Sequence, residues 1–412
     1  GLDSFGCPIC VETFNFSPGE VLSKIGVEKY IVFMVHCLEF KSIVLEELSH
    51  RKEQEWLDSL SPQDREKALR EDVEMKTKKV ELLKAEEERS RSRLAAAATA
   101  AAERLITSDK VAGIMGADCS GVTTAIANNV AVPNGVTMIS PSATSPALST
   151  IADNGYFFRT APSDARQGQV LAEITMERGF NNVAVTFINN DYGKGLSDSF
   201  VNAYKGLGGK VSAVVPHDEG KADYSAEVGA LDASGADVLA VFGYVDQGGR
   251  HIIQGSIDSG AFDKFILADG MFGDSLLKNV DGDLSGTFGT VPGTDSKGAA
   301  SFAEMAKTAG IKAGGPFTGE SYDAAALLVL AMQSGGSTDR AALASNVLAV
   351  ANTPGEKIMP GELGKALRIL ASGGAVDYVG ATNVELVGGG EASGSYKEFE
   401  IKGKAFTTVR FR

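Results

Sequence analysis

Small hydroxyl side chains follow an apolar run in the stretch Ile139–Ser149, ISPSATSPALS, which two prolines stiffen. Within it, Ser142, Ala143 and Thr144 follow the run GVTMI after Ser140 and Pro141. Hydroxyl groups and backbone N–H groups near helix N-termini can hold a carboxylate. The composition of this loop therefore favours contact with the anionic group of a small molecule.

Residues with complementary chemistry follow four other apolar runs. Ser120 comes after VAGIM, Tyr192 after VAVTFI, Tyr244 after VLAVF and Asp269 after FILA. In open parallel sheets, ligands bind beyond the carboxyl ends of the strands. A carboxylate side chain binds an ammonium group, and aromatic rings cover an apolar body and exclude water. Together with the hydroxyl-rich loop, these residues are suited to a small zwitterion.

Each of these residues also has an ordinary structural explanation. Ser120 and Ser142 are typical helix N-caps. Tyr192 is equally suited to half-buried packing, and Asp269 before Gly270 is a common turn pair. A binding site is favoured by their joint occurrence at successive strand ends.

Residue types needed for catalysis are sparse. None of the four histidines follows a predicted strand at a site position: His36, His50, His217 and His251. Cys119 lies at an expected helix N-terminus, which would lower its thiol pKa, but no histidine-plus-acid set accompanies it. No phosphate-binding glycine motif follows a strand. We therefore expect a binding protein without a cofactor, and not an enzyme.

Cys7 and Cys10 have the C-x-x-C spacing of a zinc knuckle or a redox pair. A closed zinc site needs four ligands. The nearby Cys37, His36 and His50 do not form a second paired motif. Two thiols in a leader segment are the simpler explanation, so we expect no metal site.

Charge and hydropathy exclude several classes of partner. The formal net charge of −14 argues against nucleic acid or an anionic membrane as the main partner. No window of about 18 uncharged apolar residues occurs, so direct membrane insertion is not expected. No secretory signal precedes the body of this sequence, whether it was removed or never present. With 412 residues, 43% of them hydrophobic, the chain can form about two or three domains.

From Val111 onward, short apolar runs alternate with helical segments. The predicted strands are Val111–Met115, Val136–Ile139, Val183–Ile188, Val211–Val215, Val238–Phe242, Phe265–Ala268 and Thr287–Val291. Helices are expected over residues 163–180, 194–208, 224–235 and 249–260. Apolar strands between helices predict parallel sheets that are covered on both faces. Since one sheet would be overlong, we expect an α/β fold of two doubly wound lobes, with a terminal hairpin across Gly403.

Residues 1–77 form an atypical segment that is predicted to be largely helical and charged. Charge is dense from about Leu38 to Arg93. Ser61-Pro62 is typical of a helix start, with serine as N-cap and proline at the first helical position. Mixed charge is usual on a solvated helix face, so a surface helix or linker is the simpler explanation and a partner-binding helix the alternative.

Several stretches together resemble one known family. They are AAAERLITSDKVAGIMGADCSG, MISPSATSPALS, FFRTAPSDARQGQ, NNDYGKGL, FGYVDQGG, ILADGMF, SYDAAALL and DYVGATNVELVGGGEASGSYKEFEIKGKAFTTVRF. Over residues 78–412 the sequence resembles the type I periplasmic binding proteins of ABC importers, in the branched-chain amino-acid (Leu/Ile/Val-binding) family. The resemblance implies two lobes that close on a ligand, joined by three crossovers. These would lie near Arg159–Thr160, Thr290 and Gly380.

The same resemblance divides the chain and implies roles for individual residues. The first lobe would comprise residues 78–159 and 290–379, and the second residues 160–289 and 380–412. Ser120 corresponds to the family serine that binds the amino-acid carboxylate. Thr144 corresponds to the threonine that binds both carboxylate and ammonium, and the backbone at Ser142 and Ala143 takes part in binding.

The second lobe would supply the remaining ligand contacts. Tyr192 and Tyr244 correspond to the family's aromatic residues, and Asp269 to the acid that neutralises the ammonium. Asp269 replaces a glutamate found in a relative, so its reach is shorter by one methylene.

The N-terminal quarter departs from the family pattern. Family members open with a strand that ends in a Pro-Leu-Thr-Gly-like loop, which residues 1–77 lack. Residues 28–36, EKYIVFMVH, could supply a substitute strand, and residues 39–57 a substitute helix. A missing first strand would leave an exposed edge on the first sheet. The family cysteine that is often bridged to the position of Cys119 is also absent.

The implied function is that of a periplasmic substrate-binding protein of an ABC-type importer. It would capture a small amino acid, branched-chain or related, by hinge closure and deliver it to a membrane permease. One alternative is a ligand-sensing domain of the same fold in a signalling protein. Another is a fusion or scaffold protein with an inert cleft, in which the charged N-terminal helix is the active part.

Overall fold

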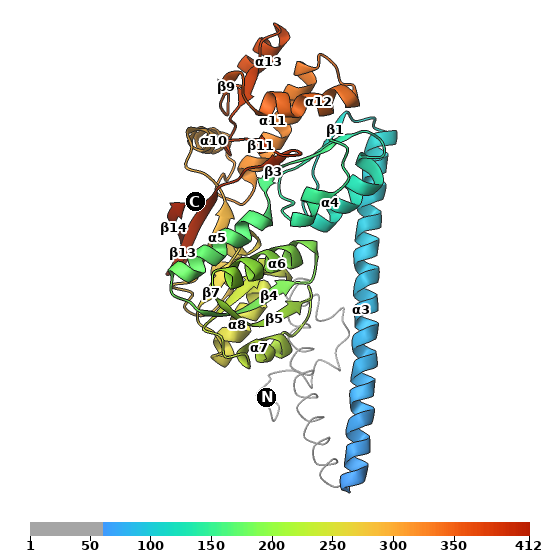
Figure 1. Cartoon of the computed structure of the whole chain (residues 1–412), viewed down its shortest axis with the longest axis vertical. Helices are drawn as coiled ribbons and strands as arrows, with labels where there is room; N and C mark the ends of the chain where they lie inside the picture. The colour runs from blue at the N-terminus through green and yellow to red at the C-terminus, as the bar shows by residue number, and fades with distance from the viewer. Residues whose placement is uncertain (1–60) are drawn as a thin grey trace, which may run out of the picture. The chain divides into compact units, whose positions relative to one another are not determined.

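The computed structural model describes residues 61–412, and side chains from residue 92 onward throughout (Figure 1). The chain divides into two compact units, Gly1–Ser90 and Arg91–Arg412. Helix α3, Pro62–Thr107, begins where Ser61-Pro62 predicts and contributes to both units. The compact second unit therefore begins later than the predicted boundary after residue 77.

Some predictions concern residues outside the described range. These are the substitute strand over residues 28–36, the substitute helix over residues 39–57, and the thiol pair Cys7 and Cys10. Among residues 61–412, no helix combines the length and apolar character that a membrane span requires.

The first sheet within the described residues has the strand order β1-β2-β3-β12-β11. Its strands are β1 Gly113–Met115, β2 Thr137–Ser140, β3 Phe157–Pro162, β12 Glu391–Ala392 and β11 Leu386–Val387. The first four are mutually parallel, and β11 is antiparallel to β12. Among residues 61–412, β1 pairs with β2 alone. A separate parallel pair joins β9 Glu356–Ile358 to β10 Val376–Tyr378.

The second sheet has the order β14-β13-β8-β7-β6-β4-β5. Its strands are β4 Asn182–Ile188, β5 Lys210–His217, β6 Val238–Phe242, β7 Phe265–Leu267, β8 Phe288–Pro292, β13 Tyr396–Lys402 and β14 Ala405–Phe411. Strands β4 to β8 are parallel. The predicted terminal hairpin is confirmed as β13 and β14, which join this sheet antiparallel to β8.

Helices cover both faces of the second sheet. Successive residues of each strand point to opposite faces, and both faces carry buried apolar side chains that the helices cover. On one face, Val183 and Val185 pack with α5 Asp164–Glu177 and α6 Asp191–Gly206. On the other face, Ala184 packs with α7 Ser225–Asp232 and α8 Arg250–Ser259. Figure 1 shows α5 and α6 side by side, with α7 and α8 across the strands. This arrangement confirms the doubly wound α/β fold.

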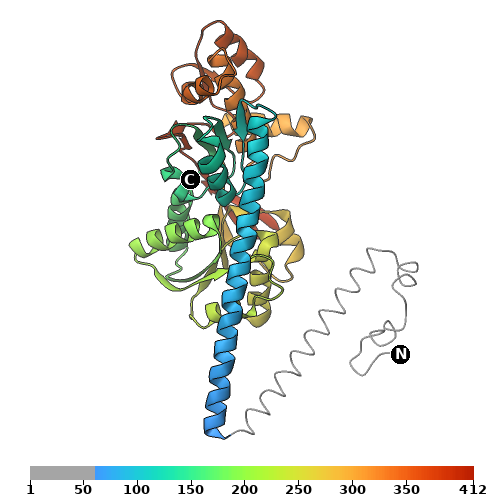
Figure 2. The same ribbon diagram turned by 90° about the vertical axis from the view of Figure 1, so that its right-hand side faces the viewer.

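The first sheet is covered in the same way. The C-terminal end of α3 and helix α4, Ser120–Ile126, pack with Met138 and Phe157 on one face. Figure 2 shows the C-terminal end of α3 beside the strands of this sheet. On the opposite face, α11 Thr318–Ser334 and α12 Arg340–Ala351 pack with Ile139 and Phe158. The remaining α-helices are α9 Asp274–Asn279, α10 Lys297–Thr308 and α13 Leu363–Ala371.

The chain passes between the sheets three times. It leaves the first sheet after β3 ends at Pro162 and returns after β8 ends at Pro292. The third passage lies between Ala392 and Tyr396, because β11 and β12 still pair in the first sheet. The expected crossover near Gly380, and with it the assignment of residues 380–392 to the second lobe, is therefore wrong. The short strands β11 and β12 carry too few residues to reveal their partner sheet from sequence.

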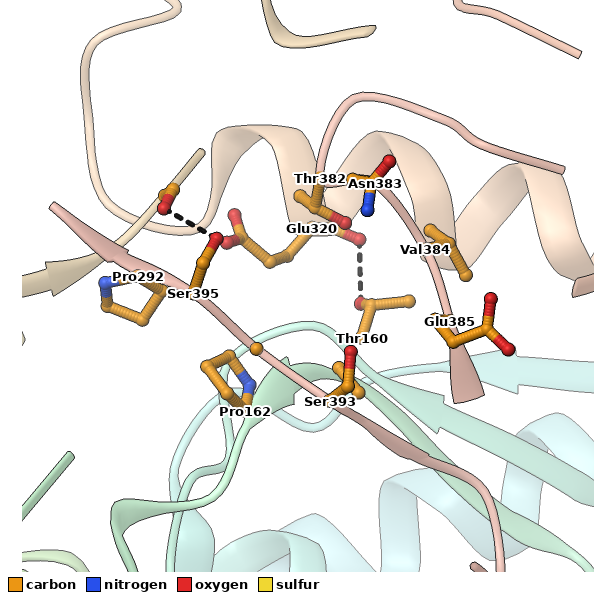
Figure 3. Close-up of a pocket in the computed structure, with 13 residues that line it drawn as sticks. Thr160, Pro162, Pro292, Glu320, Thr382, Asn383, Val384, Glu385, Ser393 and Ser395 are labelled. Atoms are coloured by element: carbon orange, nitrogen blue, oxygen red, sulfur yellow. Dashed lines mark hydrogen bonds between the residues drawn. The ribbon is translucent and has the colours of Figure 1, made fainter. Parts of the chain in front are cut away.

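A small cavity lies where the three passages meet (Figure 3). Its volume of about 20 Å³ suits a single water molecule. The Thr160 hydroxyl donates to the Glu320 carbonyl at 2.9 Å, and the Ser395 hydroxyl donates to the Gly293 carbonyl at 3.0 Å. Figure 3 shows the Glu320 side chain pointing toward Ser395. The buried Glu320 carboxyl is therefore part of the junction between the two sheets.

Candidate functional site

The hydroxyl-rich loop after β2 is held by a buried arginine on β3. The Arg159 guanidinium donates to the carbonyls of Ala143 at 3.2 Å and Ser145 at 2.9 Å. It also donates to the Ser149 hydroxyl at 2.8 Å and to the Glu391 carboxylate at 2.6 Å. Since the guanidinium is fully buried and charge-neutralised by Glu391, the loop is fixed in place before any ligand binds.

Ser120 and Ser142 lie at neighbouring strand ends, as the sequence predicts for parallel strands. The Ser120 hydroxyl oxygen accepts from the Ser145 N–H at 3.1 Å, so its own hydrogen remains available to a ligand. The Ser142 hydroxyl donates to the Asp118 carboxylate at 2.7 Å. At Ser120, helix α4 begins without a side-chain cap from Cys119.

Two tyrosines and an aspartate converge from the second sheet. The Tyr192 hydroxyl donates to the Asp269 carboxylate at 3.3 Å, and the Gly270 N–H donates to the Tyr192 oxygen at 3.2 Å. The rings of Tyr192 and Tyr244 stack with centroids 5.1 Å apart. A side chain at Gly270 would place its Cβ 2.4 Å from the Gly243 carbonyl oxygen, so only glycine allows this close approach.

A cavity of about 260 Å³ brings five of the seven predicted residues together. Its lining includes Ser120, Ser142, Tyr192, Tyr244 and Asp269. The loop before α11 adds the apolar surfaces of Pro316 and Phe317, and Phe272 contributes from the second-sheet side.

Ala143 and Thr144 are not part of this cavity lining. The Ala143 N–H donates to the Ser140 hydroxyl at 3.0 Å, and its carbonyl accepts from Arg159. The Thr144 carbonyl accepts from the Asp164 N–H at 2.8 Å. The structure therefore places both residues in the wall that supports the cavity.

Asp164 is a buried acid close to Asp269 that the sequence analysis missed. It is fully buried in the first turn of α5, and neither carboxylate oxygen has a hydrogen-bond partner among the described residues. The Thr144 hydroxyl is close enough to lower its pKa but does not reach hydrogen-bond geometry. Burying a charged carboxylate without hydrogen-bond donors is costly. We therefore expect the Asp164 carboxyl to be either protonated or paired with a cation.

The buried Asp323 provides a useful contrast. This residue of α11 is also fully buried, but it accepts four hydrogen bonds. Its donors are the Tyr378 hydroxyl at 2.9 Å, the N–H groups of Ala381 and Thr382 at 2.8 Å each, and the Thr382 hydroxyl at 2.7 Å. Asp323 thus has the hydrogen-bond donors that a structural carboxylate needs, and Asp164 lacks such donors among the described residues.

The carboxyl groups of Asp164, behind the cavity wall, and Asp269, in the cavity lining, interact with each other. Burial and the neighbouring Asp269 carboxylate hold the pKa of Asp164 well above its usual range. Burial raises the pKa of Asp269 to about 6. The pKa of Tyr192 is raised by burial and then by both carboxylates, which places the three groups in one electrostatic cluster. An ammonium group between Asp164 and Asp269 would relieve their repulsion.

A signal for Asp164 exists in the sequence. It follows the carboxyl end of β3, as Ser120, Ser142 and Asp269 follow the ends of β1, β2 and β7. The segment FFRTAP is not among the predicted strands; it carries a charge at Arg159 and ends in Pro162. Only the structure shows that Arg159 is neutralised by Glu391 on the adjoining strand.

The expectation of a low thiol pKa at Cys119 is wrong. Burial, followed by the adjacent Asp118 carboxylate, raises the pKa of this thiol. The short helix α4 does not offset these effects. Among residues 61–412, histidine, cysteine and acidic side chains do not gather into a group of three that could hold a metal ion.

A family model described as a periplasmic binding protein matches residues 67–365. The chain is 29% identical over 292 residues to the chemotactic signal transduction system substrate-binding protein BasB of Halobacterium salinarum, covering 66% of this chain and 65% of BasB. It is 30% identical over 237 residues to the Leu/Ile/Val-binding protein homolog 1 of Brucella melitensis, covering 56% of this chain and 62% of that protein. The matches thus span less than two thirds of either relative.

A solved structure shares the fold. The leucine binding protein LivK of Thermotoga maritima superposes with a TM-score of 0.65 at 23% sequence identity, covering 77% of this chain and 84% of LivK. This likeness agrees with the mixed α/β architecture and the parallel sheets of residues 91–412.

Proposed function

Because the chain belongs to the periplasmic binding protein family, in its branched-chain amino-acid binding branch, we propose that its cavity binds a small α-amino acid. The observation that carries this proposal is the pair of buried carboxylates, Asp164 and Asp269, of which Asp164 has no hydrogen-bond partner in the described chain. The ligand ammonium would lie between them. Its carboxylate would accept from the Ser120 hydroxyl and from backbone N–H groups at the start of α4.

The two sheets would form the two ligand-binding lobes. The first contributes Ser120 and Ser142, and the second contributes Tyr192, Tyr244 and Asp269. Since a ligand that contacts both sides stabilises the closed arrangement, binding would drive hinge closure at the three passages. The stacked tyrosines would cover the ligand and exclude water.

We further propose that the protein acts in the periplasm as the substrate-binding component of an ABC-type importer, handing its ligand to a membrane permease. Family membership supports this role. A second candidate function is chemotactic sensing, favoured by the similarity to BasB, which is named as a chemotactic signal transduction protein.

Calorimetric titration of the full chain with the twenty standard L-amino acids tests the binding proposal. We expect a subset to bind with a micromolar or lower Kd, and Asp164→Asn to weaken that binding at least tenfold. Absence of heat with every amino acid would refute the proposal.

Uptake and swimming assays separate the two cellular roles. A strain that lacks this protein should lose uptake of the labelled ligand if the importer role is correct. Normal uptake with lost taxis toward the ligand would instead assign the sensing role.

A further inference from the structure

The ligand cavity continues into a second cavity of about 250 Å³. The two share four lining residues, Cys119, Ser120, Tyr192 and Tyr244. The second cavity has apolar walls from α3, α4 and the end of β4, formed by Leu94, Ala95, Val122 and Ile188. A ligand side chain that leaves the ammonium site can therefore extend along an apolar surface.

The charged residues that line the joined cavities are all acidic. Asp118 and Asp269 line the first cavity, and Asp191 and Glu219 line the second. Neither lining contains a lysine, arginine or histidine among the described residues. Asp164 lies behind the wall and has no hydrogen-bond partner in the described chain; burial and then Asp269 raise its pKa, while the neighbouring Arg159 guanidinium lowers it.

A single α-ammonium group of the ligand does not neutralise all of these acidic side chains. It would neutralise the pair Asp164 and Asp269, which are the buried members. Asp118, Asp191 and Glu219 then remain without an ion pair among residues 61–412. The negative charges of Asp118 and Glu219 act at the cavity junction, since the pKa of the Cys119 thiol is raised by burial, then by Asp118, and further by Glu219.

These two acids lie on different sides of the cleft. Asp118 follows β1 of the first sheet, and its carboxylate already accepts from the Ser142 hydroxyl at 2.7 Å. Glu219 follows β5 of the second sheet. A positive charge between them would therefore attract both sides of the cleft at once.

We propose that the side chain of the bound amino acid is a methylene stem that ends in a cation, as in lysine or ornithine. The stem would lie against Val122 and Ile188, and the terminal cation would face Asp118 and Glu219. This inference rests on the proposed function, because it assumes that the α-ammonium group occupies the Asp164 and Asp269 site.

Titration of the full chain with L-lysine and L-norleucine tests this inference. Norleucine has the same four-carbon stem but lacks the terminal ammonium. Two partly screened ion pairs should make lysine on the order of tenfold tighter at low salt. The preference should shrink as the salt concentration rises, because salt screens exposed charges.

The double variant Asp118→Asn with Glu219→Gln should reduce the preference for lysine over norleucine to within about threefold. Asp232→Asn serves as the matched control, because Asp232 is an exposed acid of α7 that lines neither cavity. The control should keep the full preference.

The outcomes distinguish this inference from the proposed function. Norleucine or leucine binding as tightly as lysine, with binding still lost in Asp269→Asn, would overturn the cationic side chain and leave amino-acid binding intact. No binding of any amino acid would overturn both. A lysine preference that the double variant retains would overturn the role of Asp118 and Glu219.

Discussion

Replacing Asp269 with asparagine should weaken ligand binding and strengthen the ligand-free fold at the same time. Asparagine keeps the shape of the side chain and an oxygen that accepts from the Tyr192 hydroxyl, 3.3 Å away in the native protein. It removes the negative charge that the α-ammonium group would meet. The two effects have opposite signs because the carboxylate is unfavourable for folding and favourable for binding.

The structure sets the size of both effects. Burial raises the pKa of Asp269 from 3.8 to about 6, and one pKa unit corresponds to about 1.4 kcal/mol. Above pH 6 the ionised carboxylate therefore costs the fold up to about 3 kcal/mol, which the variant regains as a rise of a few degrees in Tm. Losing one partner of a buried ion pair costs about 2–4 kcal/mol of binding, or roughly 30- to 1000-fold in Kd.

Calorimetry with the best-binding amino acid and a thermal melt without ligand, both at pH 7.5, measure the two effects. Asp323→Asn is the matched control, because Asp323 is an equally buried aspartate with four donors. It should change Kd by less than about threefold, because Asp323 does not line the ligand cavity. An Asp269→Asn variant that binds normally, or that loses stability, would refute this explanation.

Four other predictions follow from the structure. Ligand affinity should fall as pH drops below about 6, since protonation of Asp269 removes the charge that attracts the ammonium; a Kd constant between pH 5 and 7.5 would contradict this. Burial raises the pKa of Glu320 to about 7, so its ionisation should cost stability as pH rises through 7; Glu320→Gln should raise Tm at pH 8 more than at pH 5, and an equal change would be contrary evidence. Ser120→Ala should weaken binding about 5- to 30-fold, measured by calorimetry, because one hydroxyl donor to the ligand carboxylate is lost; unchanged affinity would remove Ser120 from the site. Gly168→Ala should lower Tm strongly, because its Cβ would lie 2.6 Å from the Phe200 backbone nitrogen where α5 packs on α6; a normal melt would contradict this contact.

The sequence predicts the parallel strands β4 to β8 of the second sheet well because each contains an apolar run without charge. Val238–Phe242 is a strand over the whole predicted range, and the other predicted strands differ from the structure by a few residues at their ends. Parallel pairing then brings Tyr192, Tyr244 and Asp269 to one edge, as the rule for strand ends requires.

Prediction from the sequence is wrong where contacts between residues distant in the sequence determine the structure. β3 contains Arg159, whose charge is acceptable only because Glu391, distant in sequence, lies 2.6 Å away. Because β3 is not among the predicted strands, Asp164, which lies just beyond its end, was not considered as a strand-end residue. The third passage was misplaced for the same reason, since β12 is defined by its pairing with β3 and not by its own two residues. The thiol pKa of Cys119 depends on burial and on Asp118, which helix position alone does not reveal.

A crystal structure of the full chain with its tightest-binding amino acid tests the central claim most directly. The account predicts the α-ammonium nitrogen within hydrogen-bond distance of both Asp164 and Asp269, and the carboxylate at the Ser120 hydroxyl. Ligand bound elsewhere, or bound with its carboxylate toward Asp164 and Asp269, would contradict it.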